Sequence, residues 1–559
     1  MKHDLKTRTA AQILVDALKV HGVDLAFCVP GESYLAALDA LYDARDAIKL
    51  VVARQDGGAA YMAEGYAKLT GKPGICFVTR APGATNASIA LHTAFQDSTP
   101  MILFIGQVGS DFAEREAFQE IDYRRMFGQM AKWVASADRA DRMPELVSHA
   151  FHCAMSGRKG PVVLALPEDV LTQTAAVSDT DPYKVVEPYP GAPDIERLRE
   201  MLARAERPFV IVGGSGWNAA ACRDLRRFAE ANDLPIGCAF RFQDLFDNRH
   251  ANYAGDVGIG INPLLAQRIK EADVVLAIGP RLGEMTTSAY TLLVPPRPAQ
   301  RLIHVHPGAE ELGRVYQGDL LINAGMPQIA AALAAMPPVD ASRWRERTRT
   351  AGTQYREWIG RRGNPGRVQM WEIVDWLKHR LPEDAIVANG AGNFAGWVNR
   401  FYQYPGLRTQ IGPTSGAMGY GVPAGVAAKI AAPERLVLSL NGDGDFLMNG
   451  QELATAMQYQ AAVIFIVVNN GMYGTIRMHQ ERDYPGRVYA TDLRNPDFAA
   501  YARAFGAHGE TVEETSQFAA AFERAFAAGK PSLIEIRLDP QAITTQTTLD
   551  AIRERALRG

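Results

Sequence analysis

The sequence predicts an α/β protein with three doubly wound domains, each built on a parallel β-sheet that helices cover on both faces. Short apolar runs alternate with helical patterns throughout the chain, which is typical of repeated β-α-β units. Glycine or proline follows several of these runs, as in RAPGATN at the end of ICFVTR, and such residues mark the loops at strand ends. A chain of 559 residues with 47% hydrophobic content is long enough to bury several cores.

The order of these patterns divides the chain into three predicted domains, at residues 1–172, 191–337 and 368–545. A polar, proline-bearing stretch over 172–194 indicates a linker, and the charged segment over 342–367 separates the second domain from the third. The strands expected in the three domains are, in order, ICFVTR, MILFIGQV and PVVLALP; RPFVIVGGSGW, DVVLAIGPRLG and QRLIHVHPG; and AIVANGAGN, RLVLSLNGDGD, AAVIFIVVNN and PSLIEIRLD.

Composition and charge narrow the classes of function. The formal net charge of −3 argues against binding to nucleic acid or to an anionic membrane surface. The five cysteines lie far apart without a Cys-x-x-Cys pair, which is typical of reduced thiols in the cytosol and not of a disulfide frame or a zinc site. The N-terminal segment lacks a signal-peptide pattern, and the run AAVIFIVV is too short to span a bilayer. We therefore expect a cytoplasmic protein.

One strand of the third domain runs directly into a Gly-Asp-Gly loop. Asp443 lies between Gly442 and Gly444 at the C-terminal end of the run 435–440, and ligands bind at such ends in open α/β sheets. Glycine lets the backbone approach an anion, and the helix that follows adds partial positive charge. Because Asp443 would repel a bare phosphate, the pattern predicts a cation between them, and Mg²⁺ binds one or two carboxylates together with phosphate oxygens.

A neutral oxygen donor follows the next strand. The run VIFIVVNN ends in Asn469 and Asn470, about two dozen residues after the Gly-Asp-Gly loop. Each half alone is typical of an ordinary turn or strand end. At this separation the two halves predict one site for a magnesium ion and a phosphate group.

Together these halves resemble the Mg²⁺–thiamine diphosphate (thiamine pyrophosphate) motif of thiamine-dependent enzymes. The resemblance covers nearly the whole chain and is closest to the acetolactate synthase-like group. The segments that carry it are AEGYAKLTGKPGICFVTRAPGATNA, AFQE and MAKWV in the first domain, and GAMGYGVPAG and GDGDFLMNGQELATA in the third. It implies a pyrimidine-binding, a central and a diphosphate-binding domain, with thiamine diphosphate and Mg²⁺ as cofactors.

The resemblance also assigns roles to single residues of the cofactor site. Asp443 and Asn470 would bind Mg²⁺ through side-chain oxygens, and Met472 would bind it through its backbone carbonyl. Met418 matches the bulky apolar wedge that bends the cofactor. The other expected cofactor contacts are Asp56, Pro82, Asn86, Asn393, Phe394, Gly416, Gly442, Gly444 and Asp445.

Three of these positions depart from the family pattern. Asp445 replaces the usual Ser or Ala, and an acid beside phosphate is unfavourable unless it points away or accepts a backbone amide. Phe394 replaces a polar residue, which puts that diphosphate contact in doubt. Asp56, in RQDGGAA, stands where the family carries the glutamate that hydrogen-bonds the aminopyrimidine ring. Aspartate has the same charge but is one methylene shorter, and a misplacement of about 1 Å can cost on the order of a hundredfold in rate.

The expected residues on the substrate side come mostly from the first domain. Gly31, Glu32 and Ser33 form the loop that approaches the reacting carbon in similar enzymes. Gln119 and Lys132 match catalytic positions near that pocket. In the third domain, the guanidinium of Arg477 could clamp a carboxylate, although a surface salt bridge is an equal alternative.

Oligomeric state and a second cofactor are also addressed by the resemblance. Similar enzymes build each site across two chains, so we expect a homodimer or homotetramer with sites at the dimer interface. The central domain carries VGGSGW and IGPRLGE, where acetolactate synthases bind FAD, but a lone glycine-rich turn is weak evidence and HVHP, with His306, departs from the pattern. We do not favour FAD.

The leading functional hypothesis is decarboxylation of a small 2-oxo acid such as pyruvate, followed by carboligation. A close alternative keeps the cofactor but makes the protein a simple decarboxylase, a lyase or an oxidase. An alternative of another class is a cofactor-binding protein with weak or no catalysis, because Asp56 replaces the usual glutamate.

Overall fold

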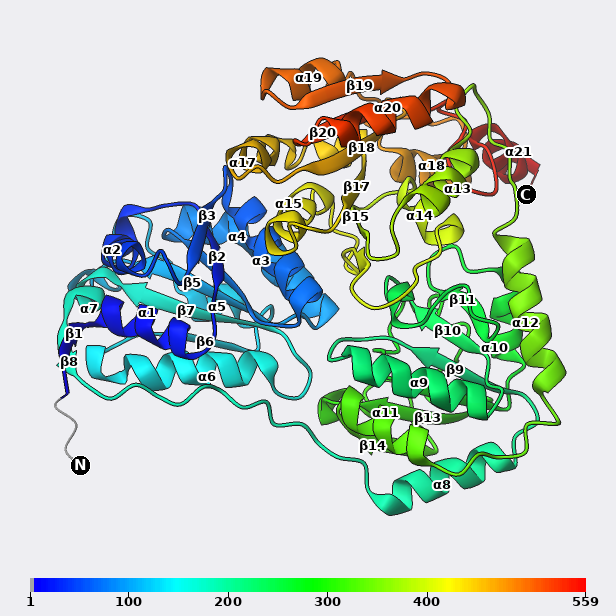
Figure 1. Cartoon of the computed structure of the whole chain (residues 1–559), viewed down its shortest axis with the longest axis horizontal. Helices are drawn as coiled ribbons and strands as arrows, with labels where there is room; N and C mark the ends of the chain where they lie inside the picture. Colours follow the sequence, from blue (N-terminus) through cyan, green and yellow to red (C-terminus); the bar gives the residue numbers. More distant parts are fainter. Residues whose placement is uncertain (1–4, 559) are drawn as a thin grey trace.

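The computed structural model describes residues 5–558 and contains three six-stranded sheets, one in each predicted domain. All strand pairs within these three sheets are parallel, and helices cover both faces, so the predicted fold class is confirmed (Figure 1). Parallel strands are buried on both faces, which explains why they appear in the sequence as unbroken apolar runs.

The first sheet has the strand order β3-β2-β4-β5-β7-β6. Its strands are β2 (Leu25–Cys28), β3 (Lys49–Val52), β4 (Gly74–Val78), β5 (Met101–Gln107), β6 (Trp133–Ser136) and β7 (Pro161–Pro167). The main helices around it are α1 (Ala10–Val20), α2 (Leu35–Asp43), α3 (Asp56–Thr70), α4 (Ala81–Asp97) and α6 (Met143–Met155). A small antiparallel pair, β1 (Thr7–Thr9) with β8 (Thr174–Ala176), closes one side of this domain.

The second sheet has the order β11-β10-β9-β12-β13-β14. Its strands are β9 (Pro208–Val212), β10 (Ile236–Ala239), β11 (Tyr253–Val257), β12 (Val274–Ile278), β13 (Arg301–His306) and β14 (Leu320–Asn323). Its helices are α8 (Ala192–Ala203), α9 (Ala219–Ala231), α10 (Pro263–Lys270) and α11 (Met326–Ala335). The charged segment after it forms helix α12 (Arg345–Trp358), which packs against this domain.

The third sheet has the order β16-β15-β17-β18-β20-β19. Its strands are β15 (Ile386–Asn389), β16 (Gln410–Ile411), β17 (Val437–Gly442), β18 (Val463–Asn469), β19 (His508–Val512) and β20 (Ser532–Arg537). Its helices include α13 (Met370–Arg380), α14 (Ala395–Phe401), α15 (Gly421–Ala431), α17 (Leu453–Gln458), α18 (Gly474–Asp483), α19 (Phe498–Ala504), α20 (Thr515–Ala527) and α21 (Leu549–Arg558).

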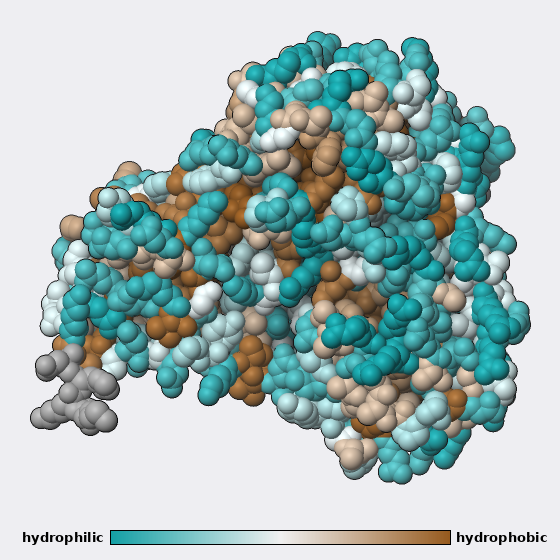
Figure 2. Space-filling model, in the orientation of Figure 1, coloured by the Kyte–Doolittle hydropathy of each residue, from teal (hydrophilic) through white to brown (hydrophobic). Residues whose placement is uncertain are grey.

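The first and third domains share one hydrophobic core, whereas the central domain has cores of its own. Helices α3 and α15 meet at the centre of the shared core, where Gly65 faces Ala424 so closely that a Cβ on Gly65 would lie 3.1 Å from the Ala424 Cα. Figure 2 shows hydrophobic residues on this face in a band that runs from the first domain towards the third. No helix within residues 5–558 has the length and apolar character needed to cross a membrane.

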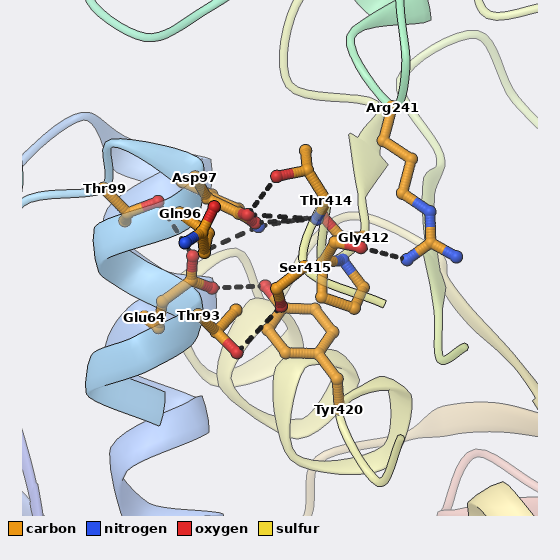
Figure 3. Close-up of polar contacts among 12 residues, drawn as sticks. Glu64, Thr93, Gln96, Asp97, Thr99, Arg241, Gly412, Thr414, Ser415 and Tyr420 are labelled. Atoms are coloured by element: carbon orange, nitrogen blue, oxygen red, sulfur yellow. Dashed lines mark hydrogen bonds and ion pairs between the residues drawn. The ribbon is translucent and has the colours of Figure 1, made fainter. Parts of the chain in front are cut away.

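A buried polar cluster also joins these two domains (Figure 3). Glu64 of α3 accepts hydrogen bonds from the Tyr420 hydroxyl at 2.5 Å and from the Thr99 hydroxyl at 2.8 Å. Asp97, at the end of α4, accepts the backbone N–H of Thr414 at 3.0 Å. Lys68 forms ion pairs with both Glu64 and Asp97. The loop 412–420 of the third domain is therefore fixed by the first domain.

Candidate functional site

A pocket of about 870 Å³ lies at the C-terminal ends of the third-domain strands. The ten cofactor and metal contacts expected in the third domain all line it: Asn393, Phe394, Gly416, Met418, Gly442, Asp443, Gly444, Asp445, Asn470 and Met472. The central domain contributes Phe240, Arg241, Ile259, Gly260, Glu284 and Met285, and residues 542–547 form a further wall. The volume lies within the range of pockets that bind cofactor-sized molecules, about 300 to 1,000 Å³.

The Gly-Asp-Gly stretch begins a helical turn, α16 (Asp443–Phe446), directly after β17. Asp443 is buried, and burial raises the pKa of its carboxyl group although hydrogen bonds act in the opposite direction. Its Oδ2 accepts the backbone N–H of Gly471 at 2.9 Å and the Nδ2 of Asn495 at 2.7 Å. This carboxylate therefore connects the ends of β17 and β18.

The donor set around Asp443 suits a magnesium ion. Asn470 and Met472 follow β18 and line the same pocket, so one carboxylate, one amide oxygen and one backbone carbonyl are available there. These are the oxygen ligands that Mg²⁺ takes, with phosphate and water filling the other positions. No group of three or more His, Cys, Asp or Glu residues suited to a metal occurs among the described residues.

Asn495 is a residue of this site that the sequence analysis missed. Its Nδ2 donates to Asp443 and, at 2.9 Å, to the Oδ1 of Asn469, so it fixes both strand-end side chains. It lies in an irregular loop, RNPDF, and no spacing or periodicity in that loop points to the site.

The carboxylate of Asp445 accepts hydrogen bonds from the protein backbone. Its Oδ1 accepts the N–H of Ala391 at 3.1 Å and that of Gly419 at 2.9 Å, and its Oδ2 has no partner in residues 5–558. Burial raises its pKa to about 7. Backbone amides thus accommodate an acid at this position. Acceptance of a backbone amide is one of the two conditions under which an acid beside phosphate is tolerated.

Phe394 covers the floor of the pocket. A Cβ added to Gly442 would lie 2.7 Å from the Phe394 ring, so the close approach of ring and loop requires glycine at 442. The neighbouring Asn393 is fixed by Thr475, whose hydroxyl donates to the Asn393 Oδ1 at 3.1 Å. Phe394 therefore offers an apolar surface here.

Asp56 occupies the first turn of α3 and is 8% exposed. Its Oδ2 accepts a hydrogen bond from Asn86 at 3.2 Å, while its Oδ1 is buried without a partner in the part of the chain described. Burial raises the pKa of the carboxyl group, and the hydrogen bond from Asn86 lowers it. Gly83, next to Pro82, allows α4 to approach, because a Cβ there would lie 2.9 Å from the Asp56 Oδ1.

Asp56 does not face the third-domain pocket of its own chain. Within residues 5–558, every residue that lines this pocket comes from the central or third domain. Asp56, Pro82 and Asn86 form a separate group on the first domain. One chain therefore carries two halves of the expected site in different places.

The substrate-side residues divide into two groups. Gly31 packs against Thr79, the Ser33 and Thr79 hydroxyls lie 3.0 Å apart, and the side chain of Glu32 is 60% exposed. Gln119 has a positive φ of 64°, its carbonyl accepts the N–H of Ala81, and its side-chain oxygen is buried without a partner in the described chain.

Lys132 and Arg477 lie outside the third-domain pocket. The ammonium of Lys132 donates to the carbonyls of Cys153 and Ser156 at 2.5 and 2.6 Å, at the end of α6. The guanidinium of Arg477 is paired with Glu481 at 3.1 Å. The charged groups of Lys132 and Arg477 are therefore both already bonded to neighbouring groups of the same chain.

The glycine loop VGGSGW of the central domain lies at the position where the resemblance would place FAD. The glycine loop after β9 is closed by Trp217, whose indole N–H donates to the Gly213 carbonyl at 2.8 Å. A cavity of about 100 Å³ lies beside this loop. The His306 ring accepts the Gly308 N–H at 3.0 Å and is also buried.

Comparisons with known proteins cover all three domains. Residues 8–126 match the N-terminal TPP binding domain of thiamine pyrophosphate enzymes, residues 195–333 match the central domain, and residues 390–536 match the C-terminal TPP binding domain.

Full-length relatives show the same extent of similarity. The chain is 30% identical to acetolactate synthase isozyme 2 large subunit of Escherichia coli (strain K12), over 95% of each chain. It is 31% identical to the acetolactate synthase of Arthrospira platensis, over 96% of this chain and 95% of that one. It is also 30% identical to the acetolactate synthase large subunit of Corynebacterium glutamicum, over 92% of this chain and 84% of that one.

Proposed function

The chain belongs to the thiamine pyrophosphate enzyme family, and on this premise we propose that it decarboxylates a 2-oxo acid such as pyruvate and joins the remaining fragment to an acceptor. It is a thiamine diphosphate-dependent enzyme of the acetolactate synthase type. The observation that carries the proposal is the gathering of ten expected cofactor contacts around one pocket of about 870 Å³.

When bound, thiamine diphosphate would supply the nucleophilic carbon and the electron sink that decarboxylation of a 2-oxo acid requires. Asp443, Asn470 and Met472 would hold Mg²⁺, which screens the diphosphate from the carboxylate. The helical turn from Gly444 would direct backbone N–H groups at the diphosphate. Met418 and Phe394 would provide the apolar walls that orient the rings and exclude water.

Asp56 would hold the proton that activates the aminopyrimidine. Asn86 keeps one carboxylate oxygen engaged and leaves the other, Oδ1, free to accept or donate at the ring. Burial raises the pKa of Asp56, which favours a proton shared with a ring nitrogen over a bare carboxylate. The same burial restricts solvent exchange of that proton.

We propose that two copies of the chain assemble with Asp56 of one facing the pocket of the other. Among residues 5–558, none from the first domain lines the pocket of a single chain, which supports this arrangement. Exposed hydrophobic side chains on the first and third domains, including Ile89 and Met448, are suited to such a contact. A homodimer is the smallest unit that completes a site, and a homotetramer contains two such units.

We also propose a cytoplasmic location, consistent with five free cysteines.

Hydrogen–deuterium exchange at C2 of the bound cofactor tests the proposal without knowledge of the substrate. The protein is loaded with Mg²⁺ and thiamine diphosphate and followed by quenched-flow NMR. We expect exchange faster than in free cofactor, a fall to the free rate in Asp56→Asn, and retention in Asp56→Glu. A screen of 2-oxo acids would then identify the donor.

One outcome favours the alternative of a cofactor-binding protein with little catalysis. If the unmodified protein exchanges no faster than free cofactor and Asp56→Glu restores exchange, aspartate is too short for the reaction. The proposal of an active carboligase would then be rejected, while cofactor binding would remain.

A further inference from the structure

A short segment, residues 491–495, runs antiparallel to the loop that carries the expected metal ligand Met472. The segment and the loop form an isolated β-bridge between Met472 and Asp492. Two backbone hydrogen bonds flank the bridge, both at 2.8 Å: the Leu493 N–H donates to the Gly471 carbonyl, and the Tyr473 N–H donates to the Thr491 carbonyl. The backbone around Met472 is therefore held in place by this segment.

The segment ends at Asn495, whose side chain reaches the ends of two neighbouring strands. Its Nδ2 donates to the Oδ2 of Asp443 at 2.7 Å and to the Oδ1 of Asn469 at 2.9 Å. Asp443 directly follows β17, and Asn469 is the last residue of β18. One half-buried amide group thus spans both strand ends, next to the carboxylate that is expected to bind Mg²⁺.

The hydrogen bonds at Asp443 determine which of its oxygens is open to a metal ion. A carboxylate has about four lone-pair positions, two on each oxygen. Oδ2 accepts from the Gly471 N–H at 2.9 Å and from Asn495, so both of its positions are taken. Oδ1 accepts from the Gly444 N–H at 3.0 Å and has no other donor among residues 5–558, so one of its positions stays open.

We propose that Asn495 is a positioning residue of the metal site, which holds Asp443 so that its carboxylate binds Mg²⁺ through Oδ1 alone. This inference rests on the proposed function, because it presupposes that the pocket takes Mg²⁺ with thiamine diphosphate. Mg²⁺ demands nearly octahedral geometry, and a single oxygen from Asp443 leaves positions for Asn470, Met472, phosphate and water. Ca²⁺ is larger and accepts bidentate carboxylates in a flexible shell. Asn495 thus favours Mg²⁺ over Ca²⁺.

Loss of the Asn495 amide would open one lone-pair position on Oδ2 of Asp443. The carboxylate would then be able to rotate or to bind a cation through both oxygens, since the Gly471 N–H alone would hold Oδ2. Asn469 would lose its link to Asp443 but would keep its hydrogen bond to Glu535 at 2.7 Å. Hydrogen-bond partners of metal ligands typically contribute about 10- to 100-fold to metal affinity.

Electron paramagnetic resonance with Mn²⁺ tests this role on the full-length protein. Mn²⁺ takes the same oxygen ligands as Mg²⁺, and the signal of the free ion reports binding at saturating thiamine diphosphate. We expect Mn²⁺ affinity about 10- to 100-fold weaker in Asn495→Leu, which nearly keeps the side-chain size but loses both N–H groups. Displacement of Mn²⁺ by Mg²⁺ and by Ca²⁺ is measured in parallel, and the ratio of these two affinities should shift towards Ca²⁺. A residue that only stabilised the fold would leave this ratio unchanged.

The matched control is Asn364→Leu. Asn364 is also a half-buried asparagine that precedes a proline, and it lies outside the third-domain pocket. Its Nδ2 donates to the carbonyls of Pro365 and Val368, both at 2.8 Å. Loss of these hydrogen bonds should lower the melting temperature without changing Mn²⁺ affinity or the ratio of Mg²⁺ to Ca²⁺ affinity.

Asn495→Ser, a smaller change, takes the place of Asn495→Leu if that variant does not fold, as judged by circular dichroism, and it should also bind Mn²⁺ more weakly than Asn364→Leu. Equal Mn²⁺ affinity in the variants at 495 and 364, or an unchanged ratio of Mg²⁺ to Ca²⁺ affinity, would overturn the proposal. An unmodified protein that binds no Mn²⁺ would overturn the metal site together with this role of Asn495. Failure of the proposed catalysis is seen separately, as exchange at C2 no faster than in free cofactor, and does not alter the binding readout.

Discussion

Asp445 holds two loops together beside a pocket that we propose binds a diphosphate. Asp445→Ala would leave the N–H groups of Ala391 and Gly419 without an acceptor, at about 1–3 kcal/mol for each buried group. We expect a lower melting temperature and thiamine diphosphate affinity weakened about tenfold or more, measured by differential scanning fluorimetry and titration calorimetry. Asp445→Asn keeps an acceptor oxygen and should lose less. Tighter cofactor binding in Asp445→Ala would show that repulsion by the carboxylate outweighs its anchoring role.

Among the site residues, those at strand ends were the easiest to predict from the sequence. Asp443, Asn470 and Met472 follow neighbouring parallel strands, and such ends meet at one edge of the sheet, so sequence order alone brings them together. Side chains outside this rule were harder to place. Arg477 and Glu481 are an i,i+4 pair within α18, so their spacing is a helical signal that could have predicted the pairing. Asn495 reaches the site from an irregular loop and leaves no periodic signal.

At the scale of elements, the C-terminal helix α21 is held to α18 by one buried carboxylate. Glu481 accepts from Arg553 at 2.5 and 2.7 Å, and Arg477 adds a third contact. The hydrogen bond from Arg553 is the main reason that the pKa of Glu481 falls to about 2. The folded-state pKa lies below the ordinary value near 4.5, so this stabilisation is present above pH 4.5 and is lost as the pH falls from there towards 2.

Glu481→Gln should therefore loosen α21 near neutral pH. We expect hydrogen exchange of Leu549–Arg558 to rise about tenfold at pH 7, measured by mass spectrometry. The difference between variant and unmodified protein should shrink as the pH approaches 2. Asp483→Asn, which breaks the exposed contact with Arg482, is the control and should change little. Equal protection of α21 in both variants at pH 7 would contradict the role of Glu481.

The three parallel sheets followed from alternating apolar runs and helical patterns, and the structure confirms them. The charged segment 342–367 was harder to interpret, because it appears polar throughout. It forms α12, whose buried face consists of Thr348, Ala351, Gly352 and Tyr355, with Trp344 buried at the position just before the helix. Because most of this face is small or polar, its helical spacing is not marked by an apolar pattern in the sequence.

At the scale of the whole molecule, the separation of Asp56 from the third-domain pocket makes a quantitative prediction. Inactive Asp56→Ala and Asp443→Ala proteins, mixed as unfolded chains and refolded together, should regain about a quarter of the unmodified activity. Half of the dimers would be mixed, and each mixed dimer would contain one intact site of two. Activity is measured on the 2-oxo acid found by the screen. Each protein refolded alone is the control, and no recovery in the mixture would indicate that each site is built within one chain.

Residues 542–547 form a wall of the cofactor pocket, and they follow β20, the last strand of the third sheet. On the ribosome, where domains form in order of synthesis at roughly 5 to 20 residues per second, this wall emerges after every strand of all three sheets. A nascent chain that stalled after β20 would already hold its sheets but lack a closed pocket. If the pocket binds thiamine diphosphate as proposed, capture of the cofactor would be a late step of biosynthesis and would distinguish finished chains from stalled ones.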